Sequence, residues 1–134
     1  MKNETKNELI TEGSALMAEF LDWSKTEKGN FMIPNLFPFE GNAGETEWET
    51  NSMNFHDRWD WLMPVANKII KLYMTNYGII QKELRNDSSY IARMAVKSMF
   101  YLSDVSGQLE IDSVFLKCFD FLKWYKSILR GGGN

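Results

Sequence analysis

The chain has 134 residues, of which 44% are hydrophobic and 25% are charged. This composition is close to that of ordinary globular domains and excludes collagen-like, low-complexity and largely disordered chains. The net charge of −3 provides no overall basic field of the kind that nucleic-acid-binding domains carry. One Cys and one His exclude a disulfide framework and a zinc site built from His and Cys within one chain.

The N-terminal segment alternates lysines and glutamates, and no apolar run of signal-peptide length follows it. No stretch approaches the roughly 18 apolar residues of a membrane span, and Cys118 has no partner for an intrachain disulfide. We therefore expect a cytoplasmic protein that makes no membrane contact. The length predicts a single globular domain over residues 1–130, and the glycines predict a flexible tail over 131–134.

Apolar side chains recur at helical spacing over residues 3–24 and predict an amphipathic helix. The segment 31–54 contains two prolines and two glycines and cannot form one helix. Within it, residues 31–33 and 48–55 are predicted strands. The turn-like segment 41–44 would join them into a small β-hairpin.

A second helix is predicted from Asp57 to about Met74. Asp57 is a competent N-cap, because its carboxylate can accept a bond from an early backbone N–H. Pro64 lies well inside this helix and removes the backbone bond to the carbonyl of Asp60. The sequence therefore predicts a kink at Pro64.

The segment 79–102 is ambiguous, with a helix over 89–102 as the prediction and a strand as the alternative. A last helix is predicted from a cap at Asp112, with apolar residues on one side and basic residues near its end. The predicted fold is a mainly helical α+β single domain with a Pro-kinked central helix and a small β-hairpin or sheet. A compact all-helical fold is the alternative.

Charge is divided unevenly along the chain. Residues 1–60 hold 5 basic and 12 acidic side chains, a net charge of −7, whereas residues 61–134 hold 10 and 6, a net charge of +4. One interpretation is two solvated faces that attract each other in the fold. The other is a dipolar surface that steers a charged partner.

The densest cluster of reactive groups consists of His56, Asp57 and Asp60. A metal site of the HD type needs further His ligands, although the two acids could hold a hard cation weakly. A cryptic hydrolase would have to use His56 as its base, but no G-x-S-x-G elbow is present and Cys118 lies on an apolar helix stripe, where a thiol is inert. We therefore predict no enzymatic activity, no metal site and no cofactor.

Aromatic and acidic residues in the first half indicate a protein-binding surface. Trp59 and Trp61 lie two residues apart and point to different sides of a helix, so one can be buried while the other serves as an interface anchor. The segment 31–39 is apolar yet loop-like, and it can either fold down over the core or leave part of its length as an exposed apolar patch for a protein partner. The predicted contact residues are Phe37, Phe39, Glu45, Glu47, Glu49 and Trp61.

The alternative surface is a basic patch in the second half, where lysines and arginines occur near tyrosines. This combination is typical of proteins that bind single-stranded nucleic acid. The residues of the predicted patch are Arg85, Arg93, Lys97, Lys123, Lys126 and Arg130.

The segment F-H followed by W-D-W-L-M-P-V, at residues 55–65, resembles a family of small phage and prophage proteins, chiefly of Bacteroidetes-type bacteria, with an F-H-x-S-W-D-W-L-M-P-V-like segment. Two further matches are E-F-L-x-W at residues 19–23 and F-L-K-W-Y at 121–125, which is similar to F-I-K-W-Y in the family. Arg58 departs from the family's usual Ser, and Asp57 is expected to take over its capping role.

The resemblance implies a phage protein of the host bacterial cytosol that binds and disables a host factor. Its most concrete form is an anti-CRISPR protein, which blocks a CRISPR–Cas RNA-guided nuclease by occlusion or by disturbing guide-RNA binding. The alternative is an accessory protein of phage DNA or RNA metabolism that binds nucleic acid through the basic second half.

Overall fold

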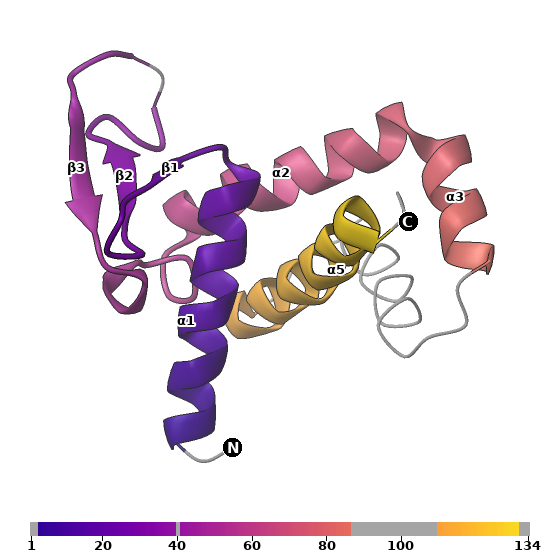
Figure 1. The fold of residues 1–134 in the computed structure, drawn as a ribbon, viewed down its shortest axis with the longest axis horizontal. Coiled ribbons are helices and arrows are strands. Elements are labelled where there is room, and N and C mark those ends of the chain that lie inside the picture. Colours follow the sequence, from indigo (N-terminus) through magenta and orange to yellow (C-terminus); the bar gives the residue numbers. More distant parts are fainter. Residues whose placement is uncertain (1–2, 40, 87–109, 132–134) are drawn as a thin grey trace. The chain divides into compact units, whose positions relative to one another are not determined.

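The computed structural model describes residues 3–39, 41–86 and 110–131. These residues form helices and a small three-stranded antiparallel sheet (Figure 1), which confirms the predicted mainly helical α+β fold. The chain divides into two compact units, unit 1 (Met1–Val65) and unit 2 (Ala66–Asn134), where the sequence predicts one domain over 1–130. Within the described ranges, none of the helices combines the length and apolar character needed to cross a membrane.

Helix α1 (Asn3–Phe20) ends four residues before the predicted helix over residues 3–24. Asp22 follows it with a φ of 63°, in the left-handed region that residues other than Gly seldom adopt. Two backbone bonds close the helix in the pattern of a Schellman motif, from Asp22 N to Glu19 O (3.0 Å) and from Trp23 N to Ala18 O (3.1 Å). The helical periodicity therefore continues beyond the point at which the backbone leaves the helix.

The sheet of unit 1 consists of β1 (Ser24–Lys25), β2 (Phe31–Pro34) and β3 (Glu45–Trp48), with β2 in the centre and β1 and β3 at the two edges (Figure 1). Strand β2 confirms the prediction for residues 31–33. The predicted strand over 48–55 is wrong, because β3 ends at Trp48, where the predicted strand begins, and the 3-10 helix η1 (Thr50–Ser52) follows. Pairing with β2 outweighs the low strand propensity of glutamate in β3.

Helix α2 (Trp59–Thr75) lies within two residues of its predicted bounds and runs from unit 1 into unit 2. Pro64 lies inside the helix as expected, and the kink there stays a prediction. The predicted N-cap is wrong, because Asp57 lies in a turn two residues before α2. The carbonyl of Arg58 accepts the amide bonds of the first turn instead, at 3.1 Å each.

In unit 2, α3 (Tyr77–Asn86) shows that the start of the ambiguous segment is helical. The predicted helix over residues 89–102 lies outside the described residues. Tyr73 and Gln81 join α2 and α3 within unit 2, because the Gln81 Nε2 donates to the Tyr73 hydroxyl at 2.5 Å.

Helix α5 (Ile111–Gly131) confirms the last predicted helix. It begins one residue before Asp112, so this acid lies in the first turn rather than at the cap, where its charge still suits the helix dipole. It also includes Gly131, the first residue of the predicted tail. The described side chains of α5 that are hydrophobic and buried are Val114, Phe115, Cys118, Phe119, Phe121, Leu122 and Trp124.

Candidate functional site

Trp61 lies in a cluster of aromatic rings inside unit 1. Its ring centroid is 5.2 Å from that of Phe55, 5.3 Å from those of Phe37 and Trp48, and 6.2 Å from that of Trp23. Only 7% of the residue is exposed. Trp61 therefore belongs to the core of unit 1, which corrects its prediction as a contact residue, because its ring is not available to a partner.

The outward tryptophan is Trp59, which is 40% exposed. This confirms that one of the two tryptophans is buried while the other stays accessible. Met63, one helical turn later on the same face, is 38% exposed. Trp59 and Met63 are therefore exposed apolar residues that the sequence reasoning did not include among the contacts.

Residues 35–44, here called the Phe39 loop, connect β2 to β3 and carry the most exposed large apolar side chain of the described residues. Phe39 is 79% exposed and Leu36 is 40% exposed. Phe37, by contrast, is half-buried and packs edge-on against Trp23 at 4.9 Å between centroids. Of the two phenylalanines predicted for contact, Phe39 is thus the accessible one, and Leu36 of the same loop is also exposed.

Hydrogen bonds fix both ends of the Phe39 loop. The backbone amide of Asn35 donates to the carbonyl of Gly44 (2.9 Å), and the Asn35 Nδ2 donates to the carbonyl of Ala43 (2.8 Å). The hydroxyl of Thr46 donates to the Asn35 Oδ1 at 2.5 Å. Gly44 has a φ of 84°, which favours glycine at this position. Because hydrogen bonds close the loop at its base, binding of a partner would cost less of the loop's conformational entropy.

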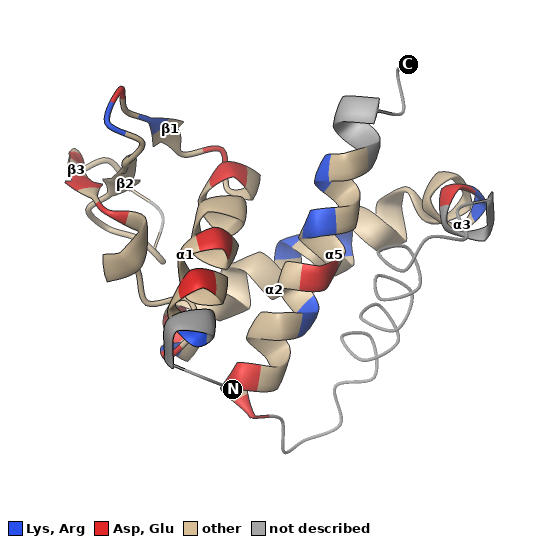
Figure 2. Cartoon of the chain, turned by 60° about the horizontal axis from the view of Figure 1, so that its bottom comes forward, with Lys and Arg blue, Asp and Glu red and all other residues tan. Residues whose placement is uncertain are grey.

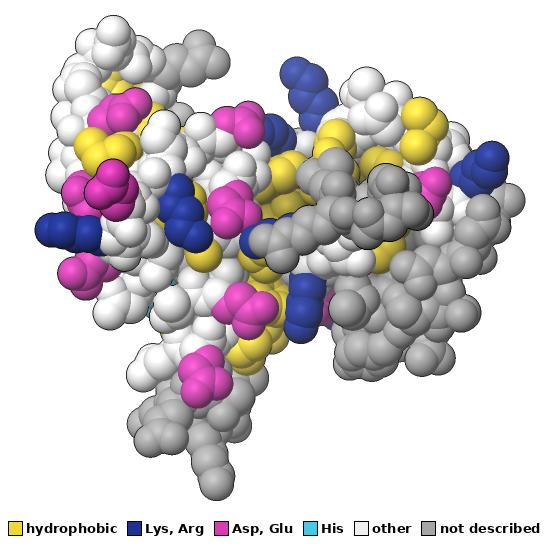
Figure 3. All heavy atoms as spheres, in the orientation of Figure 1, with side chains coloured by type: hydrophobic (Ala, Val, Ile, Leu, Met, Phe, Trp, Pro, Cys, Tyr) yellow, Lys and Arg dark blue, Asp and Glu magenta, His cyan; other side chains and the backbone are white. Residues whose placement is uncertain are grey.

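The predicted acidic contacts are all exposed and follow the Phe39 loop directly. Glu45 and Glu47 lie in β3, two residues apart, so their side chains share one face of the sheet. The Glu47 Oε2 accepts hydrogen bonds from the Asn30 Nδ2 (2.7 Å) and the Thr26 hydroxyl (3.3 Å). Glu49 lies between β3 and η1. In Figure 3, acidic and apolar side chains lie next to one another on the surface in the region of the strands.

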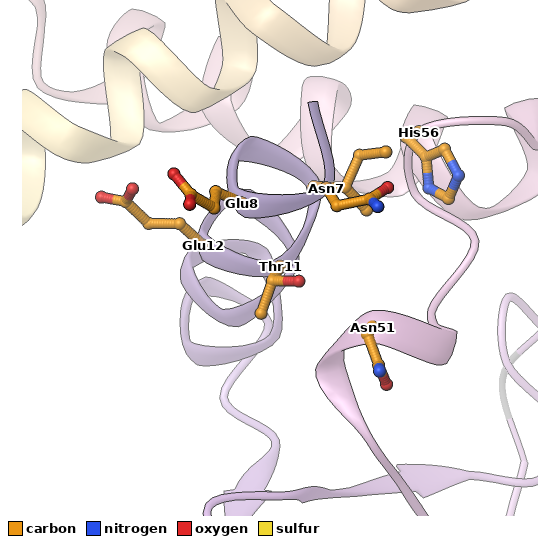
Figure 4. A pocket seen from close by; sticks show the side chains of 7 residues that line it. Asn7, Glu8, Thr11, Glu12, Asn51 and His56 are labelled. Carbon is orange, nitrogen blue, oxygen red and sulfur yellow. The ribbon is translucent and has the colours of Figure 1, made fainter. Parts of the chain in front are cut away.

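A hollow of about 630 Å³ lies on unit 1 between α1, η1 and the turn that carries His56. Figure 4 shows Asn7 next to His56, with the carboxylates of Glu8 and Glu12 pointing away from the imidazole. The lining residues are Asn7, Glu8, Ile10, Thr11, Glu12, Asn51 and His56. Among the residues that the structure describes, no group of three His, Cys, Asp or Glu side chains is arranged to hold a metal ion.

The three members of the predicted His–Asp cluster do not share one set of contacts, because Asp60 pairs with a different residue from the other two. The His56 Nε2 lies 3.8 Å from the Asp57 Oδ2. Asp60 instead accepts two bonds from Arg58, at 3.1 Å from its Nε and 2.7 Å from its Nη2. A cation shared by Asp57 and Asp60 would have to displace this bidentate pair.

Cys118 lies fully buried in α5, and desolvation raises the pKa of its thiol from 9.0 to about 12. A nucleophilic cysteine needs the opposite shift, because the thiolate is the reactive form. This supports the prediction that Cys118 is a packing residue.

The predicted basic patch lies largely beyond the described side chains. Arg93 and Lys97 lie outside the described residues, and only the backbone of Arg85 and Arg130 is described. Lys123 is exposed on α5, and its Nζ lies 5.7 Å from the centroid of the Phe119 ring. Lys126 is half-buried on the same helix. The structure therefore leaves the patch as a prediction.

The division of charge follows the division into units. Residues 61–65 carry no charge, so unit 1 has a net charge of −7 and unit 2 of +4. In Figure 2, the positions of acidic residues are red along α1 and around the strands, whereas α5 carries several blue positions of basic residues as well as red ones. The exposed apolar loop and the acidic strand therefore belong to a strongly acidic unit.

No protein-family model, curated protein or solved structure matches this chain.

Proposed function

We propose that the chain is a non-enzymatic binding protein that inhibits a host defence effector, most concretely a CRISPR–Cas RNA-guided nuclease. The observation that carries the proposal is the Phe39 loop, which presents Phe39 and Leu36 to solvent from a hydrogen-bonded base. Exposed aromatic side chains on preorganised elements are the usual anchors of protein interfaces. The resemblance to small phage proteins supports a partner in the host.

The inhibitor acts by occupying a surface of the effector. A specific interface buries about 800 Å² on each partner, and the exposed surface of the chain, 8621 Å², is ample for that. The negative charge of unit 1 suits a partner that carries a basic groove for its guide RNA, since opposite potentials speed association and fix orientation. Inhibition then results from occlusion or from disturbed guide-RNA binding.

The test is a plaque assay in hosts that target a phage through a CRISPR–Cas system, with and without expression of the chain. Expression should raise the efficiency of plating at least about tenfold, and the Leu36→Ala/Phe39→Ala double variant should lose this protection. Ile79→Ala is the matched control, because Ile79 is 68% exposed on α3 and lies outside the loop. The proposal is contradicted if the chain protects the phage against none of the CRISPR–Cas systems tested. It is also contradicted if Ile79→Ala loses as much protection as the double variant.

A gel shift across a salt series tests the alternative, nucleic-acid binding through the basic second half. Phosphate contacts give a steep loss of affinity with salt. Tight, salt-sensitive binding of RNA or DNA by the chain alone, without any effect on plating, would favour the accessory role in nucleic-acid metabolism.

A further inference from the structure

Among the described residues, strand β3 pairs only with β2 and forms one edge of the sheet, and its register determines which main-chain groups face outward. Residue pairs in an antiparallel ladder alternate between hydrogen-bonded and non-hydrogen-bonded. The amide of Asn35 donates to Gly44 at 2.9 Å, which makes this pair hydrogen-bonded. The next pair, Pro34 with Glu45, is therefore non-hydrogen-bonded, in agreement with the missing N–H of proline.

The same alternation makes the pair of Met32 with Glu47 non-hydrogen-bonded. The N–H and C=O groups of Glu45 and Glu47 therefore point away from β2, to the side where the sheet ends. Both residues are exposed. Two donors and two acceptors are thus available in the spacing that an added strand requires.

The side chains of these two residues add a chemical preference. In an added strand, the residues opposite Glu45 and Glu47 would form hydrogen-bonded pairs with Cα atoms about 5.5 Å apart. Their side chains would lie on the face of the two carboxylates, and opposite charges at such positions stabilise the pairing. The bonds from Asn30 and Thr26 hold the Glu47 carboxylate on that face. The net charge of −7 on unit 1 likewise favours an added strand that carries positive charges.

We propose that the outer edge of β3 accepts, by strand addition, an extended segment of a partner protein that carries Lys or Arg at alternate positions. This inference rests on the proposed function and specifies how part of the partner is recognised. Main-chain bonds supply the affinity and the alternating cations supply the selectivity. The competing view is that the short, charged edge only prevents unwanted pairing, and it predicts no binding.

The probe is a seven-residue peptide that alternates threonine and lysine, titrated into the isotope-labelled full chain and followed by NMR. Amide shifts should be centred on β3. A peptide that alternates threonine and glutamate should bind at least about tenfold more weakly, and so should a threonine–lysine peptide with N-methylated lysine amides. No binding at about 10 mM peptide, or equal binding of the glutamate peptide, overturns the inference.

Two variants separate the main chain from the charge. Glu47→Pro removes the outward N–H without touching a bond to β2, and Glu47→Ala is its control because both lose the carboxylate. We expect Glu47→Pro to bind the peptide at least about fivefold more weakly than Glu47→Ala. Equal affinity of the two contradicts strand addition. If Glu47→Pro does not fold, the N-methylated peptide tests the same bonds from the partner's side.

The charge test compares Glu45→Gln/Glu47→Gln with Glu8→Gln/Glu12→Gln, which removes the same charge from α1. We expect about tenfold weaker peptide binding for the first and less than a twofold change for the second. If both double variants lose peptide affinity equally, the net charge of the chain alone explains the preference for the lysine peptide, and the inference is overturned. If the edge variants keep full protection in the plaque assay while Leu36→Ala/Phe39→Ala loses it, the inference is wrong and the proposed function stands.

Discussion

Replacing Trp61 by alanine is expected to destabilise the chain much more than replacing Trp59. Trp61 is 7% exposed and its ring faces those of Trp23, Phe37, Trp48 and Phe55 at centroid distances of 5.2 to 6.2 Å. Truncating a buried tryptophan costs about 3–5 kcal/mol, because the apolar area is lost and a cavity is left. Each lost ring pair adds about 0.5–1.5 kcal/mol of geometry-dependent attraction, part of which is already included in that range.

Trp59 is the matched control, since it lies on the same helix and is 40% exposed. Substitutions at exposed positions usually change the free energy of unfolding by about 0.5 kcal/mol, and the half-covered ring allows about 1 kcal/mol. Urea unfolding followed by circular dichroism measures both variants without relying on tryptophan fluorescence. Values for Trp61→Ala and Trp59→Ala that agree within about 1 kcal/mol would refute the assignment of Trp61 to the core.

Three further predictions concern the buried Ser14 and Cys118 and the half-buried Asp120. Ser14→Ala should raise the free energy of unfolding by about 0.5–1.5 kcal/mol, because the Ser14 hydroxyl is buried and has no hydrogen-bond partner among the described residues; a loss of stability in urea unfolding would contradict this. Cys118 should react with a thiol reagent at pH 8 only after unfolding, because burial raises its pKa to about 12, and fast labelling of the native chain would contradict the burial. Desolvation raises the pKa of Asp120 above 3.8, against the opposing charges of Lys117 and Lys123, so the folded state binds this proton more tightly than the unfolded state. Asp120→Asn should therefore raise the free energy of unfolding at pH 7. This gain in stability should disappear as the pH falls through the pKa of Asp120 to below 3.8. A gain in stability that persists below pH 3.8 would exclude desolvation of the carboxylate as its cause.

The elements that the sequence predicts well are those whose apolar spacing agrees with their environment. Helices α2 and α5 each have one continuous apolar stripe, and their packing confirms it. The position of Trp61 also follows from the stripe, because it precedes the buried Val65 by four residues, whereas Trp59 precedes the exposed Met63 by the same interval. This spacing could have replaced Trp61 by Trp59 among the predicted contacts.

The elements that the sequence misses depend on pairing or on single backbone angles. Strand β3 contains two glutamates with low strand propensity, and it forms because residues 45–48 pair with a buried strand that lies earlier in the chain. The end of α1 depends on the left-handed angle of Asp22, which the apolar periodicity does not report. The open edge of β3 is a consequence of this pairing, so no local pattern in the sequence could have indicated it.

The response of stability to salt distinguishes the two interpretations of the charge division. Unit 1 carries 12 acidic and 5 basic side chains, and like charges within one compact unit repel each other. If this repulsion is the larger effect, raising the salt concentration from about 0.02 to 0.5 M screens it and stabilises the chain, by on the order of 0.5 kcal/mol. Attraction between oppositely charged faces would give the opposite sign, because salt weakens it. We expect stabilisation, since an acidic unit that keeps its charge unneutralised can attract a cationic partner. A fall in the urea midpoint with added NaCl would contradict this expectation and indicate that the two charges neutralise each other within the chain.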